Sequence, residues 1–223
     1  MPNTLQRNAS SSCAQGTPAG LPCGKPGKDG VMEGAKQQAE QEGGRSWRAI
    51  KSEQQGATAR IQQSSPLLQK VGVGFDCGDA ALNEFLQRQT GEKQRRGFGK
   101  TYVALAEDGT TVTGFVTVSA GQIATASLSA QSKLPRHPAP ILRIGRLAVD
   151  VRHQGKGTGQ DLLAFALRLA VEFSQRVGLY AVVVDAKHDK AKAFYTKLGF
   201  IACVDSPLSL YLPVATLEQA CMA

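Results

Sequence analysis

Residues 148–163, AVDVRHQGKGTGQDLL, place a glycine-rich turn between two apolar runs. The run before the turn is typical of a strand, and the run after it has apolar residues at helical spacing. Gly155, Gly157 and Gly159 stand at alternate positions, where glycine lets the backbone approach a ligand closely. The first N–H groups of a helix have no intrahelical partner and carry partial positive charge. Three basic side chains accompany the turn: Arg152, His153 and Lys156. The stretch therefore predicts a strand–turn–helix unit that suits a pyrophosphate.

Two common phosphate-binding motifs do not fit this stretch. A dinucleotide fingerprint requires Gly-x-Gly-x-x-Gly early in a βαβ unit, whereas these glycines are spaced Gly-x-Gly-x-Gly and come late in the chain. An ATP-type loop ends in Gly-Lys-Ser/Thr, whereas Lys156 is followed by Gly157. What remains is Gln154-x-x-Gly157-x-Gly159, leading into a helix.

The chain divides into two parts of different composition. Residues 1–64 are rich in Ser, Gly, Pro and Gln and poor in apolar side chains, so we expect a disordered, low-complexity leader. A start codon assigned too far upstream would leave the same pattern. Residues 65–223 have the apolar patterning of one folded domain.

The folded part alternates helical and strand patterns, which predicts an α/β domain built on a central sheet. Within the long helix we expect an apolar stripe made of Leu162, Ala166, Leu169, Ala170 and Phe173, ending near Gly178. Asp79 and Asp189 are the expected caps of two shorter helices. The expected elements are a helix from about 79, a hairpin around Asp108-Gly109, a loop at 131–140, a strand at 141–150, a helix at 159–178, a buried strand at 179–186, a helix at 189–200 and a strand at 209–217.

Composition excludes some classes and leaves others open. The five cysteines are odd in number and form no Cys-x-x-Cys pair, which argues against a disulfide framework and a zinc site, so we expect no metal and reduced thiols in a cytoplasm. No apolar run approaches the length of a membrane span, and the N-terminus lacks a secretion signal. The net charge of +8 favours an anionic partner, although a solvated basic surface would give the same value.

The turn and its surroundings resemble the GNAT N-acetyltransferase superfamily. Its acetyl-CoA signature, Gln/Arg-x-x-Gly-x-Gly/Ala between a strand and a helix, is similar to Gln154–Gly159, and DKAKAFYTKLGF is similar to a downstream family element. Together with FDCGDAALNEFL, RIGRLAVD and VVVDAK, the match narrows to the TacT-like toxins of type II toxin–antitoxin pairs and covers about residues 66–217. The resemblance implies a GNAT fold, with a mixed, twisted sheet flanked by helices and strands that splay apart at the acetyl-CoA site.

The resemblance also implies roles for individual residues. Backbone N–H groups of Leu147 and Val149 would hold the pantetheine and thioester, and those of Gln154–Gly159 the pyrophosphate. The full set of expected acetyl-CoA contacts is Leu147, Ala148, Val149, Arg152, Gln154, Gly155, Lys156, Gly157, Thr158 and Gly159. Tyr195 is the expected general acid, because a phenol with a pKa of about 10 keeps its proton at neutral pH and can donate it to a departing thiolate. The alternative for Tyr195 is a core aromatic role.

The family acceptor is the α-amine of aminoacyl-tRNA, whose acetylation blocks translation. Four basic residues are the first candidates for tRNA phosphate contacts: Arg95, Arg96, Arg143 and Arg146. None of His137, His153 and His188 is an obvious general base, and water would then take the amine proton. A ribbon–helix–helix antitoxin and a homodimer are implied as partners.

Two alternatives stay open on the sequence alone. The same enzyme would act on a protein or small-molecule amine if its acceptor mouth carried acidic residues, of which few are visible. A binding protein that merely retains the fold is a third hypothesis, and the intact glycine turn and Tyr195 argue against it.

Overall fold

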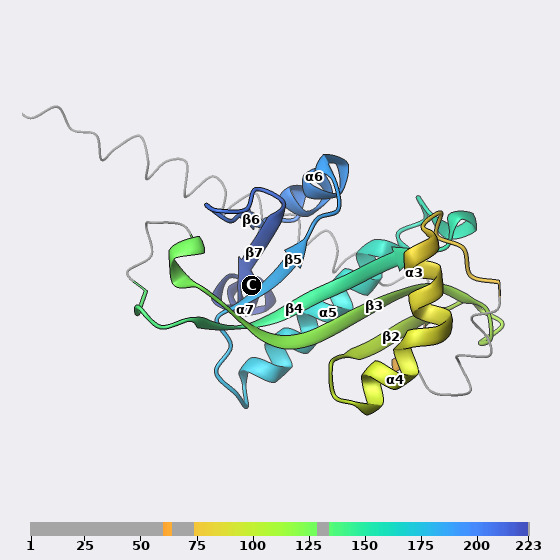
Figure 1. Ribbon diagram of the computed structural model, residues 1–223, viewed down its shortest axis with the longest axis horizontal. Coiled ribbons are helices and arrows are strands. Elements are labelled where there is room, and N and C mark those ends of the chain that lie inside the picture. Colours follow the sequence, from red (N-terminus) through yellow and green to blue (C-terminus); the bar gives the residue numbers. More distant parts are fainter. Residues whose placement is uncertain (1–59, 64–73, 129–133, 223) are drawn as a thin grey trace, which may run out of the picture.

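The structure is a computed structural model that describes residues 60–63, 74–128 and 134–222. Its centre is a seven-stranded sheet of order β1-β2-β3-β4-β5-β7-β6 (Figure 1). All neighbours are antiparallel except β4 and β5, which are parallel. The strands are β1 Arg60–Gln63, β2 Lys100–Leu105, β3 Val112–Ile123, β4 Ala139–Val149, β5 Ala181–Asp185, β6 Ile201–Ala202 and β7 Ser209–Pro213. The predicted mixed α/β sheet is confirmed.

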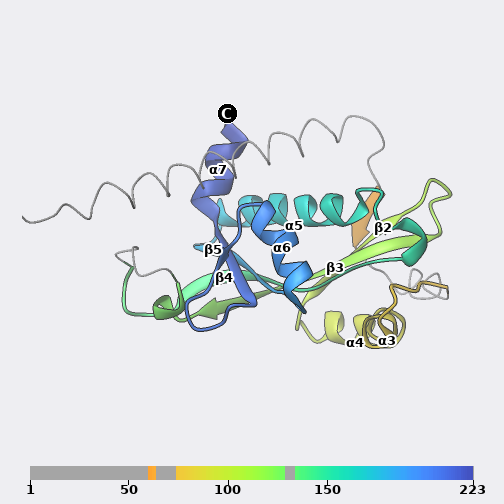
Figure 2. The same ribbon diagram turned by 90° about the horizontal axis from the view of Figure 1, so that it is seen from above.

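Helices cover both faces of the sheet. Figure 2 shows α5, α6 and α7 on one face and α3 and α4 on the other. The helices are α3 Ala80–Glu84, the π-helical η1 Phe85–Gln89, α4 Thr90–Arg95, the 3-10 turns η2 Thr125–Ser127 and η3 Val151–His153, α5 Thr158–Ser174, α6 Asp189–Lys197 and α7 Val214–Met222. Among the described residues, no helix is both long and apolar enough to cross a bilayer.

Buried side chains form a separate apolar cluster under each helical layer. Under α5, α6 and α7 the strands contribute Val116, Ile144 and Val184 among others. Under α3 and η1, Phe85 packs against Phe115 of β3 with ring centroids 6.0 Å apart. A third cluster on that second face contains Ile141, Val183 and Tyr211. The alternation of buried residues along β4 and β5 therefore serves two cores, as a central strand requires.

Several predicted elements are confirmed. Asp79 caps α3, because its side chain accepts hydrogen bonds from the N–H groups of Ala81 and Leu82. The hairpin joins β2 to β3, with Gly109 at a φ of 68° in its turn. Gly199, at a φ of 86°, lies just beyond the end of α6.

The predicted stripe and end of the long helix need correction. Leu162, Ala166 and Ala170 of the predicted stripe are buried, and Leu163 and Leu167 are buried beside them. Phe173, in contrast, is 38% exposed. The start of α5 lies close to β3, since a Cβ on Gly114 would stand 2.8 Å from Leu162 Cδ1. The helix also ends at Ser174, before Gly178, where the Ser174 hydroxyl bonds to Glu218 of α7.

The cap of α6 and the C-terminal segment also differ from prediction. His188, and not Asp189, caps α6, since its Nδ1 accepts from the Ala191 N–H. The predicted strand at 209–217 ends at Pro213, and Val214 begins α7, because Leu217 is buried against the core beside α5. Apolar runs this short do not distinguish a strand from a buried helical turn.

Two predicted irregular segments contain strand residues. Arg60–Gln63, assigned to the leader, form β1 and pair with Leu105 to Tyr102 of β2. Residues 1–59 and 64 of the predicted leader lie outside the described part, so its disorder stays a prediction. In the predicted loop at 131–140, residues 131–133 lie outside it as well, and β4 already begins at Ala139. Pro140 is tolerated there because it stands at the start of the strand.

Candidate active site

The parallel strands β4 and β5 part halfway along the sheet. They pair only from Ile141–Ala181 to Ile144–Val184, while β4 continues to Val149. Beyond Ile144 one extra residue, Gly145, interrupts the register of β4 with β3, as Thr117 pairs with Arg146 and Val118 with Ile144. A β-bulge of this kind bends its strand. The result is an opening between β4 and β5 at their C-terminal ends.

The backbone of β4 directs polar groups into this opening. The Asp150 N–H donates to Thr113 O at 2.9 Å, toward β3. Successive residues of a strand point their N–H groups to opposite sides, so those of Leu147 and Val149 point away from β3. On that side β5 has already departed. Leu147 and Val149 thus have the orientation required of amides that hold an extended thioester arm.

The glycine turn stands at the end of the same strand. Gly155 and Gly157 have φ angles of 75° and 89°, in the left-handed region that glycine adopts without strain. Gly157 is the N-cap of α5 and has no side chain to satisfy the first N–H groups, those of Thr158 and Gly159. A Cβ at Gly155 or Gly157 would meet no atom of the described residues within 4 Å. The turn therefore offers open amides and open space, which fits a diphosphate.

Gly159 keeps the passage between the turn and the opening clear. A Cβ on Gly159 would lie 3.5 Å from Val149 Cγ2 and 4.0 Å from Leu147 Cδ2. A larger side chain would therefore extend over the two residues whose amides face the opening. Gly159, at the start of α5, therefore lies beside the two β4 residues that border the opening.

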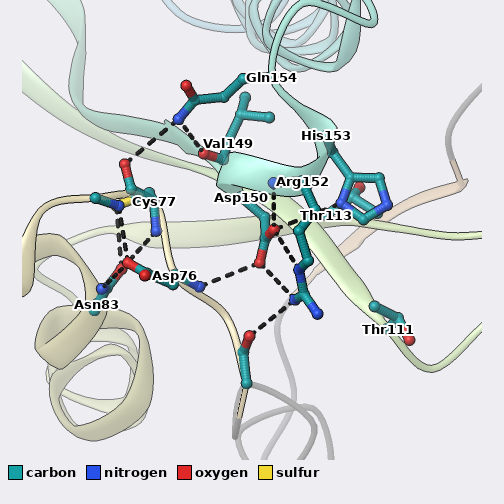
Figure 3. Close-up of polar contacts among 12 residues, drawn as sticks. Asp76, Cys77, Asn83, Thr111, Thr113, Val149, Asp150, Arg152, His153 and Gln154 are labelled. Atoms are coloured by element: carbon teal, nitrogen blue, oxygen red, sulfur yellow. Dashed lines mark hydrogen bonds and ion pairs between the residues drawn. The ribbon is translucent and has the colours of Figure 1, made fainter.

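The buried carboxylate of Asp150 fixes where this turn begins (Figure 3). Asp150 is 0% exposed and accepts from the Arg152 backbone N–H at 2.9 Å, from the Arg152 guanidinium at 2.8 and 2.7 Å, and from the Asp76 N–H at 3.1 Å. The Arg152 side chain is the largest of the causes that hold the pKa of Asp150 well below its usual range. Asp150 is therefore ionised at neutral pH and ties the turn to residues 74–79.

Arg152 and Gln154 were predicted to contact acetyl-CoA, and the structure gives their side chains other partners. The Arg152 guanidinium bonds to Asp150 and to Gly74 O at 2.9 Å. The Gln154 amide donates to Val149 O at 3.0 Å and to Cys77 O at 3.4 Å, as Figure 3 shows. These side chains hold the turn in place, while Lys156 is exposed beside it. Acetyl-CoA contacts by any of the ten predicted residues remain predictions.

Tyr195 lies on α6, on the face of the sheet that α5 covers. It is 8% exposed and belongs to the same apolar cluster as Leu147 and Val149. Its ring meets Phe194 and Phe200 edge to face, with centroids 5.3 and 5.6 Å away. Burial raises the pKa of Tyr195 to about 12. The phenol therefore keeps its proton at every pH at which the enzyme is expected to work.

The four predicted tRNA-binding arginines lie on or beside the opposite face. Arg146 stacks over the Phe85 ring at 3.9 Å, and Arg143 is paired with Asp185. Arg96 bonds to Glu92 at 3.1 Å and lies over Phe98, while Arg95 is exposed at the end of α4. The structure thus brings these arginines to the α3–α4 side of the sheet, away from the α5 face.

Sequence reasoning missed two features of this region. Asp150 stands at the end of an apolar strand and gave no signal beyond its acidity, because its donors Asp76 and Arg152 are set by the fold. The Asp79–Lys187 ion pair joins residues 108 apart in sequence and is visible only in three dimensions. Of the three histidines, His188 caps α6 and His137 is exposed, whereas His153 is half-buried with its Nδ1 3.7 Å from Asp150.

Comparison with known proteins matches this site to a family. An acetyltransferase (GNAT) domain model matches residues 94–202. The tRNA-acetylating toxin of Mycobacterium tuberculosis is 33% identical over 143 residues, which are 63% of this chain and 84% of that protein. The probable toxin TacT of Sinorhizobium fredii is 27% identical over 174 residues, 74% of this chain and 96% of that protein.

Solved structures give the same result. A tyrosine-to-phenylalanine mutant of KacT superposes with a TM-score of 0.69 at 32% identity, covering 73% of this chain and 99% of that one. AtaT in complex with acetyl-methionyl-tRNAfMet superposes with a TM-score of 0.65 at 30% identity, covering 72% and 97%. Further AtaT structures, at TM-scores of 0.61 and 0.62, hold acetyl-CoA or the C-terminus of the antitoxin AtaR.

The chain therefore belongs to the GNAT acetyltransferase family, in its branch of TacT-like toxins. It is an acetyltransferase that uses acetyl-CoA.

Widening Gly159 should weaken acetyl-CoA binding. We expect Gly159→Val to raise the KM for acetyl-CoA about 10-fold, because its methyl groups would crowd Val149 and Leu147 where the ligand passes. Steady-state kinetics at saturating acceptor measure this. Gly178→Ala is the control, since a Cβ at Gly178 would meet no atom of the described residues within 4 Å and Gly178 lies beyond α5. An unchanged KM in Gly159→Val would place the ligand elsewhere.

Proposed function

We propose that this protein transfers the acetyl group of acetyl-CoA to the α-amine of aminoacyl-tRNA and thereby blocks translation. The observation that carries the proposal is the separation of β4 from β5 beside the outward amides of Leu147 and Val149, with the glycine turn following on the same strand. The similarity to the tRNA-acetylating toxin of Mycobacterium tuberculosis and to AtaT in complex with acetyl-methionyl-tRNAfMet supports the choice of acceptor.

Different residues would bind acetyl-CoA, polarise its thioester carbonyl and donate the proton. The amides of Gly157, Thr158 and Gly159 bind the diphosphate, and those of Leu147 and Val149 orient the thioester and polarise its carbonyl. Tyr195 donates its proton to the sulfur that departs as the amine attacks. Acetyl-CoA supplies the activated acyl group, and the glycine turn, held by Asp150, fixes its direction.

No strong general base is needed for this acceptor. An α-amine has a pKa near 8, about two units below that of a lysine side chain, so a substantial fraction is neutral at pH 7. The amine of an aminoacyl ester is less basic still, since the ester withdraws electrons. Water can accept the proton that it releases on attack.

We also propose the partners that the family suggests. The basic side chains that we propose as contacts for tRNA phosphates are Arg95, Arg96, Arg143 and Arg146, on the α3–α4 side of the sheet. Restraint would come from a ribbon–helix–helix antitoxin, a proposal supported by the AtaT structure with its antitoxin. The active form would be a homodimer of the folded domain, whose sheet includes Arg60–Gln63 of the predicted leader as β1.

Transfer of a labelled acetyl group tests the proposal. The purified chain is incubated with radiolabelled acetyl-CoA and a pool of charged tRNA, and the aminoacyl end is then released and analysed. Label is expected on the α-amine of released amino acids and absent from uncharged tRNA. Label on protein lysines alone would contradict the proposed acceptor.

The pH dependence of kcat should lack an alkaline loss caused by Tyr195. A phenol whose pKa is raised to about 12 is protonated below that value and loses its proton only as the pH rises through it. We therefore expect kcat with charged tRNA to hold from about pH 8 to pH 9.5, once the amine is neutral. A fall in kcat centred near pH 9 would indicate that Tyr195 titrates early and would contradict its buried, protonated state.

A further inference from the structure

The strongest charge arrangement outside the cofactor site lies where β4 and β5 separate. Arg143 and Ile144 face Val183 and Val184 in the last paired positions, and Asp185 is the next residue of β5. Arg143 shares its face with Ile141, and Asp185 shares its face with Val183, which places both on the α3–α4 side. They therefore stand at the base of the opening, on the side opposite to α5 and Tyr195.

Two carboxylates border this side of the opening, and each is matched by a cation. Asp185 is ion-paired with Arg143 and accepts a hydrogen bond of 2.8 Å from the Ser209 hydroxyl. Asp79, at the start of α3, is ion-paired with Lys187, which follows β5. Lys187 is also the main reason that the pKa of Asp79 is lowered, so this carboxylate is ionised at neutral pH.

The other charged groups of the described residues on this side have partners of several kinds. Arg146 has the Phe85 ring as its partner, and Lys93 also lies over that ring at 5.5 Å. Glu92 is paired with Arg96 along α4. Asp76 accepts hydrogen bonds from Gly78 and Asn83, and Asp205 accepts one from Ser127, all of them neutral donors. Asp79 and Asp185 differ from these two carboxylates in being paired with a cation.

We infer that Arg143 and Lys187 determine the class of acceptor by masking Asp185 and Asp79. An amine with high positive charge, such as a polyamine or a lysine side chain, needs free carboxylates beside the thioester to be held there. An aminoacyl-tRNA brings one weakly basic amine together with many phosphates. Unpaired carboxylates would repel these phosphates, and carboxylates that are paired with a cation repel them less. The inference rests on the proposed function and assigns its acceptor specificity to two ion pairs.

Double variants that remove both charges of an ion pair distinguish masking of the carboxylate from direct phosphate binding by the cation. Arg143→Gln uncovers Asp185, and Arg143→Gln/Asp185→Asn removes both charges while the Asn oxygen still accepts from Ser209. Lys187→Gln and Lys187→Gln/Asp79→Asn form the second pair, in which Asn retains the helix cap. Each variant is assayed with charged tRNA and with spermidine, and the KM for acetyl-CoA and the Tm check that the cofactor site and the fold are intact.

The inference makes opposite predictions for the single and the double variants. Arg143→Gln should raise kcat/KM for spermidine about 10-fold and lower it for charged tRNA by a similar factor. The double variant should lose the spermidine gain and return to within about threefold of the wild type on charged tRNA. The Lys187 pair should behave in the same way with smaller changes, because Lys187 is more exposed.

Other outcomes overturn the inference without touching the proposed function. If Arg143→Gln loses activity on charged tRNA, gains none on spermidine and is not rescued by Asp185→Asn, Arg143 contacts phosphate directly and masking is refuted. If the wild type fails to acetylate charged tRNA, the proposed function is refuted, and the spermidine assay still decides whether Arg143 masks Asp185.

Discussion

Tyr195→Phe should lower kcat by about 10²–10⁴-fold while the protein stays folded and still binds acetyl-CoA. Only the hydroxyl is removed, and the edge-to-face contacts of the ring with Phe194 and Phe200 remain. Without the proton donor, the thiolate must depart unassisted. Single-turnover acetylation of charged tRNA measures the loss, and calorimetry with acetyl-CoA measures binding.

A matched tyrosine controls for the loss of a phenol elsewhere. Tyr102 on β2 is half-buried and packs against Phe165 of α5 with ring centroids 4.8 Å apart, so Tyr102→Phe removes a similar hydroxyl from the same face. We expect it to retain activity within about twofold of the wild type, as a substitution outside the site should. Equal activity in Tyr195→Phe and Tyr102→Phe would reduce Tyr195 to a core aromatic.

Asp150→Ala should be the most destabilising single substitution in the site, costing about 3 kcal/mol of unfolding free energy. It removes a fully buried carboxylate and leaves the N–H groups of Asp76 and Arg152 without their acceptor. The start of the glycine turn then loses its attachment to residues 74–79. Urea unfolding at pH 7 measures the loss, and we expect the KM for acetyl-CoA to rise as well.

Acid titration adds a second test of Asp150. Its pKa is lowered in the folded state, so its contribution to stability is present above the unfolded value near pH 4 and is lost as the pH falls through the folded value. The difference in stability between wild type and Asp150→Ala should therefore narrow below pH 4. Asp108→Ala is the control for a carboxylate that is not buried. Its pKa is also lowered, to about 2, but Asp108 caps an exposed hairpin turn. A constant difference across this range would show that the charge of Asp150 is not what stabilises the fold.

Local sequence patterns predicted most helices and strands, because these elements follow from apolar runs and turn residues within the segment itself. The apolar run at Ala181–Val184 and the turn at Gly109 each specify one structure. β1 escaped prediction because three of its four residues are polar, and its position depends on pairing with β2 and on the packing of Ile61 against the core. The buried side of α5 also contains Leu163 and Leu167, while Phe173 in its last turn is exposed, so helical spacing alone placed Phe173 in the wrong position.

In the site, backbone features could be predicted from the sequence and side-chain contacts could not. Backbone features, such as the left-handed glycines and the cap at Gly157, follow from sequence because glycine carries that information itself. Side-chain partnerships do not, since they depend on which distant residues the fold brings together. Arg152 was predicted to bind the ligand from its place in the turn, and only the structure shows its guanidinium on Asp150.

A crystal structure of the protein with coenzyme A tests the central claim most directly. The account predicts diphosphate oxygens within about 3 Å of the N–H groups of Gly157, Thr158 and Gly159. It also predicts the pantetheine arm between β4 and β5, with its sulfur beside the Tyr195 hydroxyl. Coenzyme A bound on another surface, or an arm that does not enter the opening beside Leu147 and Val149, would contradict it.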